Sequence, residues 1–273
     1  YIPDHFGISV ADITTGAWFV TEAENERKLM DEIVRYNPAE IICNQSFEMS
    51  GADLEDIRCR LGITLFTLDD WYSDEELCRK CLKDHFTVSS LSGLGLEDYS
   101  CGCIAAGSLL QYLKETQKTD LSNMTGITPY ASGRYMIIDS SSRRNLELCE
   151  TLREKQKRGS LLWVLDKTRT AMGARMLRSF IEQPLIDMEE INARLEAVEE
   201  LKNNAIVREE LREYLNPIYD LERLISRISY RSANPRDLIA FKQSLKMIPP
   251  IRYLLGSLQS PKLKALWEEL DEL

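Results

Sequence analysis

Alternating apolar and polar residues at the start of the chain predict a β-hairpin. One strand runs from Ile8 to Ile13, and the other contains Trp18-Phe19-Val20. The turn between them is Thr14-Thr15-Gly16, in which the glycine can adopt a positive φ angle.

The residues that follow the hairpin alternate between helical and strand patterns. Strands are predicted over 40–43 and 63–68, and helices over 23–36, 52–61, 73–85 and 99–116. Ser73 and Glu76 fit a capping box, in which the serine oxygen accepts a backbone N–H and the glutamate reaches back. Strands that alternate with helices predict an α/β layered domain with a partly parallel sheet.

Residues 117–134 change character, because they are polar, contain two glycines and one proline, and lack periodicity. We expect them to link an α/β domain, residues 1–116, to an all-α domain, residues 135–273. In the second domain, helices are expected to begin at Asp187, Asp220, Asn234-Pro235 and Pro261, and one is expected to end at Pro249-Pro250.

Charge is distributed unevenly along the chain. Residues 1–125 contain 10 lysine and arginine residues against 22 aspartate and glutamate residues, a net charge of −12, whereas the remainder has a net charge of +2. An acidic first part repels nucleic acid, so phosphate contacts are expected in the second part. The densest basic cluster there is Arg153, Lys155, Lys157 and Arg158, which we expect at a helix end just before Gly159.

Composition places the chain in the globular class, with 44% hydrophobic and 29% charged residues. No apolar run reaches the roughly 18 residues of a membrane span, and no export signal precedes the seven cysteines. Reduced thiols and a cytoplasmic location are therefore expected. The chain starts at Tyr1 without methionine, so we expect an excised part of a longer protein.

The sequence bears on three kinds of chemical site. No glycine-rich phosphate loop of the form GxxxxGK[ST] is present, so no nucleotide site is expected. Four cysteines, Cys78, Cys81, Cys101 and Cys103, have spacings that a zinc site could use. Four carboxylates, Asp12, Glu48, Asp69 and Asp70, could meet at strand ends as a two-metal nuclease site. The alternative to the zinc site is that these cysteines are reduced thiols. The alternative to the nuclease site is that these carboxylates are ordinary solvated side chains.

The string from Asp139 to Leu185, which begins DSSSRRNLELCE, resembles the start of the core domain of the MutS family of DNA mismatch repair proteins. RLEAVEEL (194–201), DLERLISRI (220–228) and ANPRDL (233–238) continue it in order. GISVADITTGAWFVTE (7–22) and CIAAGSLLQYLKETQ (103–117) resemble the family's connector domain.

The resemblance implies a ribonuclease-H-like connector followed by a helical core and lever domain. It implies a full-length parent that uses ATP and magnesium, binds duplex DNA with mismatches, forms a homodimer and recruits a MutL-type protein. The matched part would be no enzyme and would need no cofactor. It would couple the ATPase end of the parent to the mismatch-reading end. An independent protein-interaction module and a ribonuclease-H-like nuclease remain as alternatives.

The resemblance also implies that the connector docks the MutL-type partner. The acidic balance of residues 1–125 suits a protein partner better than DNA. Within the helix predicted over 73–85, Leu77, Cys81 and Leu82 lie near one face, and Cys81 and His85 are four residues apart. Cys81 and His85 are therefore the candidate contact residues, and Leu77 and Leu82 are alternatively explained by packing against the sheet.

Overall fold

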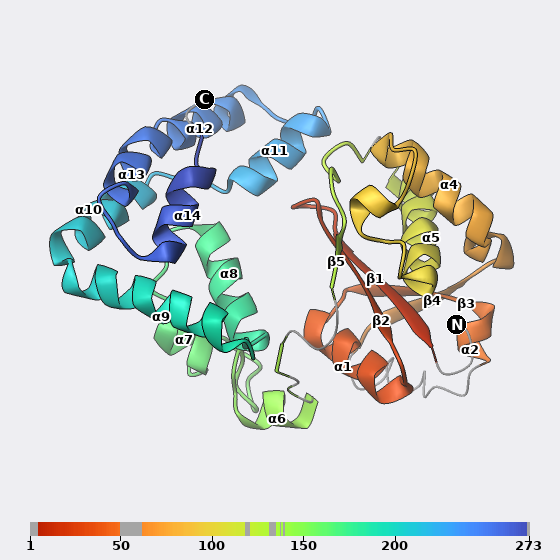
Figure 1. The fold of residues 1–273 in the computed structure, drawn as a ribbon. Coiled ribbons are helices and arrows are strands. Elements are labelled where there is room, and N and C mark those ends of the chain that lie inside the picture. The colour runs from red at the N-terminus through yellow and green to blue at the C-terminus, as the bar shows by residue number, and fades with distance from the viewer. Residues whose placement is uncertain are drawn as a thin grey trace. The chain divides into compact units, whose positions relative to one another are not determined.

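The structure is a computed structural model that describes residues 5–49, 62–117, 121–130, 135, 136, 138 and 140–271. It divides into two compact units, Tyr1–Gly133 and Arg134–Leu273 (Figure 1). The first unit combines strands and helices and the second is helical, which confirms the predicted fold class. None of the described helices has the length and apolar composition that crossing a bilayer requires.

The predicted hairpin is present in the first unit as β1 (Phe6–Asp12) and β2 (Ala17–Ala23), which pair antiparallel. Gly16 closes the turn with a φ of 78°, as its place in the sequence predicts. Ile13 lies in the turn and not in the first strand, because the pairing of β1 ends at Asp12.

Two further strands form a parallel pair, β3 (Glu40–Asn44) and β4 (Thr64–Leu68), close to their predicted bounds. The short strand β5 (Thr128–Pro129) pairs parallel with β2. Within the described residues, the strands therefore make one sheet of order β1-β2-β5 and a second of order β3-β4. The helix predicted over 52–61 lies outside the described residues.

The described helices of the first unit are α1 (Glu26–Tyr36), α2 (Gln45–Glu48), α4 (Glu75–Phe86) and α5 (Ser100–Gln117), with 3-10 turns η1 (Asp70–Ser73) and η2 (Ser92–Leu94). Of these, α1 and α5 pack on opposite faces of the first sheet. Phe6 of β1 belongs to an apolar cluster with Leu29 and Ile33 of α1. Its neighbour Gly7 points to the other face, where a Cβ atom would lie 2.0 Å from the carbonyl oxygen of Cys101 in α5.

The start of α4 differs from the predicted capping box. Ser73 ends η1, and the N-cap is Asp74, whose carboxylate accepts the backbone N–H of Leu77 at 2.9 Å. The helix therefore begins at Glu75. Its buried residues, Cys78 and Leu82, face α5, which lies beside it in Figure 1.

The segment predicted as a linker, 117–134, is packed against the first unit over residues 121–130. Its buried residues are Leu121, Asn123, Met124 and Ile127. The Asn123 side chain donates a hydrogen bond to the carbonyl of Ile13 at 2.9 Å, and β5 extends the sheet. The polar composition predicted a linker, but a few buried apolar residues hold this segment against the rest of the first unit. The division between the two units falls after Gly133.

The second unit consists of short helices joined by capped turns. Its helices are α6 (Ser140–Asn145), α7 (Leu161–Leu165), α8 (Ala171–Glu182), α9 (Met188–Asn203), α10 (Ala205–Leu215), α11 (Leu221–Ser229), α12 (Pro235–Leu245), α13 (Ile248–Leu255) and α14 (Pro261–Glu269). Asp187, Asp220 and Asn234 are N-caps, as predicted, and Asn234 forms a full capping box with Asp237.

One detail of the second unit differs from the prediction. Pro249 and Pro250 lie in the first turn of α13 and do not end α12, because proline loses no helical hydrogen bond there. The main apolar core of the second unit contains Ala197 of α9, Ile251 and Leu255 of α13, Leu258, and Leu263 of α14.

Candidate functional site

The candidate partner surface is the side of α4 that carries Leu77, Cys81 and His85. These three residues are four apart, so they follow one another along one side of the helix. Leu77 is 48% exposed, whereas Leu82 is fully buried. The packing explanation therefore holds for Leu82, while Leu77 faces solvent together with half-buried Cys81 and His85.

Each of the two candidate contact residues also has contacts within the first unit. The Cys81 sulfur lies 3.7 Å from the ammonium of Lys114 on α5, and burial raises the pKa of its thiol. His85 donates from Nε2 to the carbonyl of Met124 at 2.9 Å, and its ring lies edge-on to Trp18. His85 thus helps to hold the 121–130 segment, and its role in partner binding remains a prediction.

The candidate phosphate contacts Arg153, Lys155, Lys157 and Arg158 all lie in the loop between α6 and α7, and not at the predicted helix end. Lys155 has a φ of 48°, which is incompatible with a continuing helix. All four side chains are exposed, and Lys157 forms an ion pair with Asp166. Within the described residues the other three form no ion pair, so they are available to an external anion.

This basic loop is held by its own backbone. The N–H of Thr151 donates to the carbonyl of Gln156 at 3.0 Å, and the N–H of Leu162 donates to the carbonyl of Leu148 at 2.8 Å. Leu148 and Leu162 are also buried together in a small apolar cluster. The cations are therefore displayed on an ordered loop, although its sequence was interpreted as a helix end.

The two metal-site alternatives gain no support from the described residues, in which no three histidine, cysteine or acidic side chains are arranged to hold a metal ion. Cys78 and Cys103 are fully buried, and burial raises the pKa of Cys78 to about 11. Burial also acts to raise the pKa of Asp12, but hydrogen bonds from Thr14 and Thr15 outweigh this and lower it below its ordinary value. Asp12 thus stabilises its own turn.

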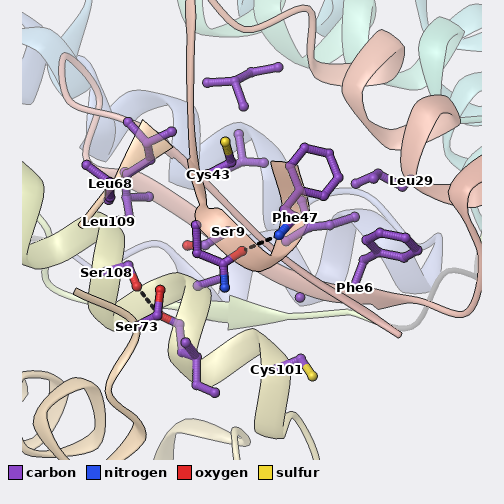
Figure 2. Close-up of a pocket in the computed structure, with 18 of the residues that line it drawn as sticks. Phe6, Ser9, Leu29, Cys43, Phe47, Leu68, Ser73, Cys101, Ser108 and Leu109 are labelled. Atoms are coloured by element: carbon purple, nitrogen blue, oxygen red, sulfur yellow. Dashed lines mark hydrogen bonds between the residues drawn. The ribbon is translucent and has the colours of Figure 1, made fainter. Parts of the chain in front are cut away.

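A partly open cavity of about 480 Å³ lies along β1 and β3 and is bordered by α1, α2 and α5 (Figure 2). Consecutive residues of both strands line it, which means that it follows the strand edges, since successive side chains point to opposite faces. Much of the lining is apolar: Phe6, Leu29 and Phe47 lie on one side of the cavity, and Leu68 and Leu109 on another, as Figure 2 shows. Among the described residues, the charged ones that line it are Glu32, Glu40 and Asp70. Carboxylates repel a phosphate-bearing ligand, and no sequence pattern indicated this cavity.

Comparison with known proteins connects both units to one family. The sequence profile of MutS domain II matches residues 3–125, and that of MutS domain III matches residues 141–273. The chain belongs to the MutS family. The predicted resemblance is confirmed, and the α/β unit corresponds to MutS domain II and the helical unit to MutS domain III.

Individual MutS proteins are similar to the chain along its whole length. It is 63% identical to the DNA mismatch repair protein MutS of Lachnoclostridium phytofermentans over 273 residues, which are 100% of this chain and 29% of that protein. It is 44% identical to MutS of Ruminiclostridium cellulolyticum over 97% of this chain and 30% of that protein. The chain therefore spans less than a third of the length of these relatives.

Proposed function

We propose that this chain is the part of a DNA mismatch repair MutS protein that couples mismatch recognition to ATP use, and that its first unit docks a MutL-type partner. The observation that supports this most directly is the presence of two separately compact units, each of which corresponds to a different MutS domain. Coupling between distant sites requires elements with more than one arrangement, which both ligands bias.

In this proposal the chain itself is not catalytic. Mismatched duplex DNA, ATP and magnesium are bound by other parts of the whole protein, which acts as a homodimer. The coupling can be tested in the full-length protein by measuring ATP turnover with matched and mismatched duplexes. Joining the two units by an engineered cross-link should reduce the difference between the duplexes. An unchanged difference in the cross-linked protein would contradict the coupling role.

The docking surface is proposed to be the side of α4 with Leu77, Cys81 and His85. Leu77 offers exposed apolar area, and the helix begins with Glu75 and Glu76 in a strongly acidic unit. An exposed apolar residue on a unit of net negative charge suits a partner that has an apolar anchor and a net positive charge. His85 also packs on Trp18, so a substitution there would change stability and binding together.

The sharper test therefore uses Leu77→Arg and Cys81→Arg in the full-length protein. Each adds a positive charge and bulk to the proposed surface, so we expect about tenfold weaker MutL association, measured by interferometry. The control Gln117→Arg adds the same charge at the exposed end of α5. Equal affinities for the two variants, the control and the parent protein, with unchanged circular dichroism, would place the docking surface elsewhere.

The basic loop supports a second, weaker role in contacting DNA phosphates. Arg153, Lys155 and Arg158 are exposed and form no ion pair among the described residues, so they can approach a duplex backbone. Such contacts carry affinity and no base preference. Replacing all three by glutamine should weaken duplex binding by this chain and reduce its dependence on salt; unchanged binding would refute the contact.

A further inference from the structure

The last described residues of the first unit are fastened to β2 through their backbone. β5 pairs Thr128 with Phe19 and Pro129 with Val20. The next residue, Tyr130, donates its N–H to the carbonyl of Val20 at 2.9 Å. Its own carbonyl accepts the hydroxyl of buried Thr21 at 2.8 Å. Both backbone groups of Tyr130 are therefore bonded to the same strand.

The side chain of Tyr130 is held by α1. Its hydroxyl donates to Glu32 Oε2 at 2.6 Å, and the same carboxylate accepts the Arg35 guanidinium at 3.0 and 3.1 Å. The guanidinium carbon lies 4.7 Å from the centre of the Tyr130 ring and 5.1 Å from that of Tyr36. We call these four residues, Glu32, Arg35, Tyr36 and Tyr130, the tyrosine anchor.

The charged pair within the anchor is largely buried, which strengthens its polar contacts. The side chains of Arg35 and Glu32 are only 10% and 11% exposed. A buried carboxylate such as that of Glu32 is stabilised by hydrogen-bond donors. Arg35 supplies a charged donor and Tyr130 supplies a neutral one. Burial raises the pKa of Tyr130 well above its usual value, so the hydroxyl remains a donor throughout the physiological pH range.

The anchor lies where the first unit ends along the chain. The second unit begins at Arg134, and only three residues, 131–133, lie between it and Tyr130. Three residues span at most about 10 Å. If Tyr130 and β5 were released, the nearest earlier fixed point would be Ile127, which is buried. Six residues, 128–133, would then join the units and could span about 20 Å.

We propose that Tyr130 is a positioning residue, and that the tyrosine anchor fixes the point from which the first unit restrains the second. This inference rests on the proposed coupling function, because coupled units cannot move independently. The anchor keeps the chain segment that joins the two units short. A displacement of one unit is therefore transmitted to the other, because the joining segment has little length to extend. Sequence reasoning missed it because Tyr130 lies in a segment whose composition is that of a linker.

The test uses the 273-residue chain without DNA, nucleotide or partner. Tyr130→Ala removes ring and hydroxyl, Tyr130→Phe removes the hydroxyl alone, and Thr21→Val removes the bond to the Tyr130 carbonyl. Tyr253→Ala, at a tyrosine that is 83% exposed in the second unit, is the control. Amide hydrogen exchange reports whether residues 121–130 are released, and NMR relaxation reports whether the two units tumble together.

We expect exchange in 121–130 to rise roughly tenfold in Tyr130→Ala and less in the two milder variants, with α5 still protected. The rotational correlation times of the two units should then diverge, while the control behaves like the parent chain. Unchanged exchange would refute the anchor, and faster exchange with unchanged tumbling would refute its positioning role. If Tyr130→Ala does not fold, the milder variants decide by the same criteria. None of these readouts involves ATP or mismatches, so failure here is distinguishable from failure of the coupling assay in the full-length protein.

Discussion

Replacing Gly107 by alanine should destabilise the first unit by separating α4 from α5. A Cβ atom at this position would lie 2.3 Å from the Cβ and 2.5 Å from the Cα of Cys78. Carbon atoms in contact are normally about 3.5–4.0 Å apart. The obstacle is backbone and the first side-chain carbon, neither of which can rotate away, so one helix must move by more than about 1 Å.

The size of the effect follows from two opposing terms. Overpacking a core typically costs about 1–3 kcal/mol, and a clash with backbone belongs at the upper end of that range. Alanine is favoured over glycine inside a helix by about 1 kcal/mol, which offsets part of the cost. We therefore expect the free energy of unfolding of the first unit to fall by about 2 kcal/mol in Gly107→Ala.

Urea denaturation followed by hydrogen exchange and mass spectrometry separates the first unit from the second. A loss of about 2 kcal/mol lowers the urea midpoint of α4 and α5 peptides by roughly 1 M. Gly93→Ala is the matched control, since its added Cβ would meet no atom within 4 Å among the described residues, apart from its own local backbone. We expect the control to change stability by less than about 0.5 kcal/mol. A midpoint for Gly107→Ala equal to or above that of the parent chain would refute the close packing of the two helices.

Further outcomes can be checked on the same chain. Burial raises the pKa of Cys78 to about 11 and that of Cys149 to about 12, so iodoacetamide at pH 8 should leave both unmodified until urea is added, as peptide mapping would reveal. Arg175→Met should destabilise the second unit by about 1 kcal/mol in thermal unfolding at neutral pH, because Arg175 donates two hydrogen bonds to Asp220 at 2.7 Å. Those hydrogen bonds hold the pKa of Asp220 below its ordinary 3.8, so this contribution is present above that pH and the difference from the parent chain should vanish as the pH falls below it. Purified chain should hydrolyse neither ATP nor DNA with magnesium or manganese, and turnover that disappears in Asp12→Asn would contradict this. Duplex binding measured by anisotropy should be weak, steeply salt-dependent and equal for matched and mismatched DNA; a preference for mismatches would overturn that expectation.

Features with a local physical cause were predictable from the sequence. The hairpin turn needs a residue that tolerates positive φ, and Gly16 supplies it next to two threonines. The start of α12 follows from Asn234 and Pro235, because the cap and the first-turn proline act within four residues. Ser73 and Asp74 are both capable N-caps, so the choice between them depended on η1, which the local pattern did not indicate.

Features that depend on distant contacts were not predictable in this way. The segment 117–134 is polar on average, and the position of its residues 128–130 is decided by pairing with β2, about a hundred residues earlier. The basic cluster was placed at a helix end because charge alone does not distinguish a loop from a helix terminus. For the candidate partner surface, helical spacing correctly placed Cys81 and His85 on one side of α4, whereas the packing of His85 on Trp18 required the structure.

The late position of β5 has a consequence for synthesis on the ribosome. Thr21 and the Tyr130 carbonyl that it contacts are 109 residues apart, so β2 leaves the ribosome long before its partner does. At roughly 5–20 residues per second, the delay is on the order of 5 to 20 s. During that interval the edge of β2 that pairs with β5 is unpaired, and an exposed strand edge can pair with other nascent chains. Slower translation would lengthen this exposure, so the yield of the first unit should depend on chaperones more strongly than its final stability suggests.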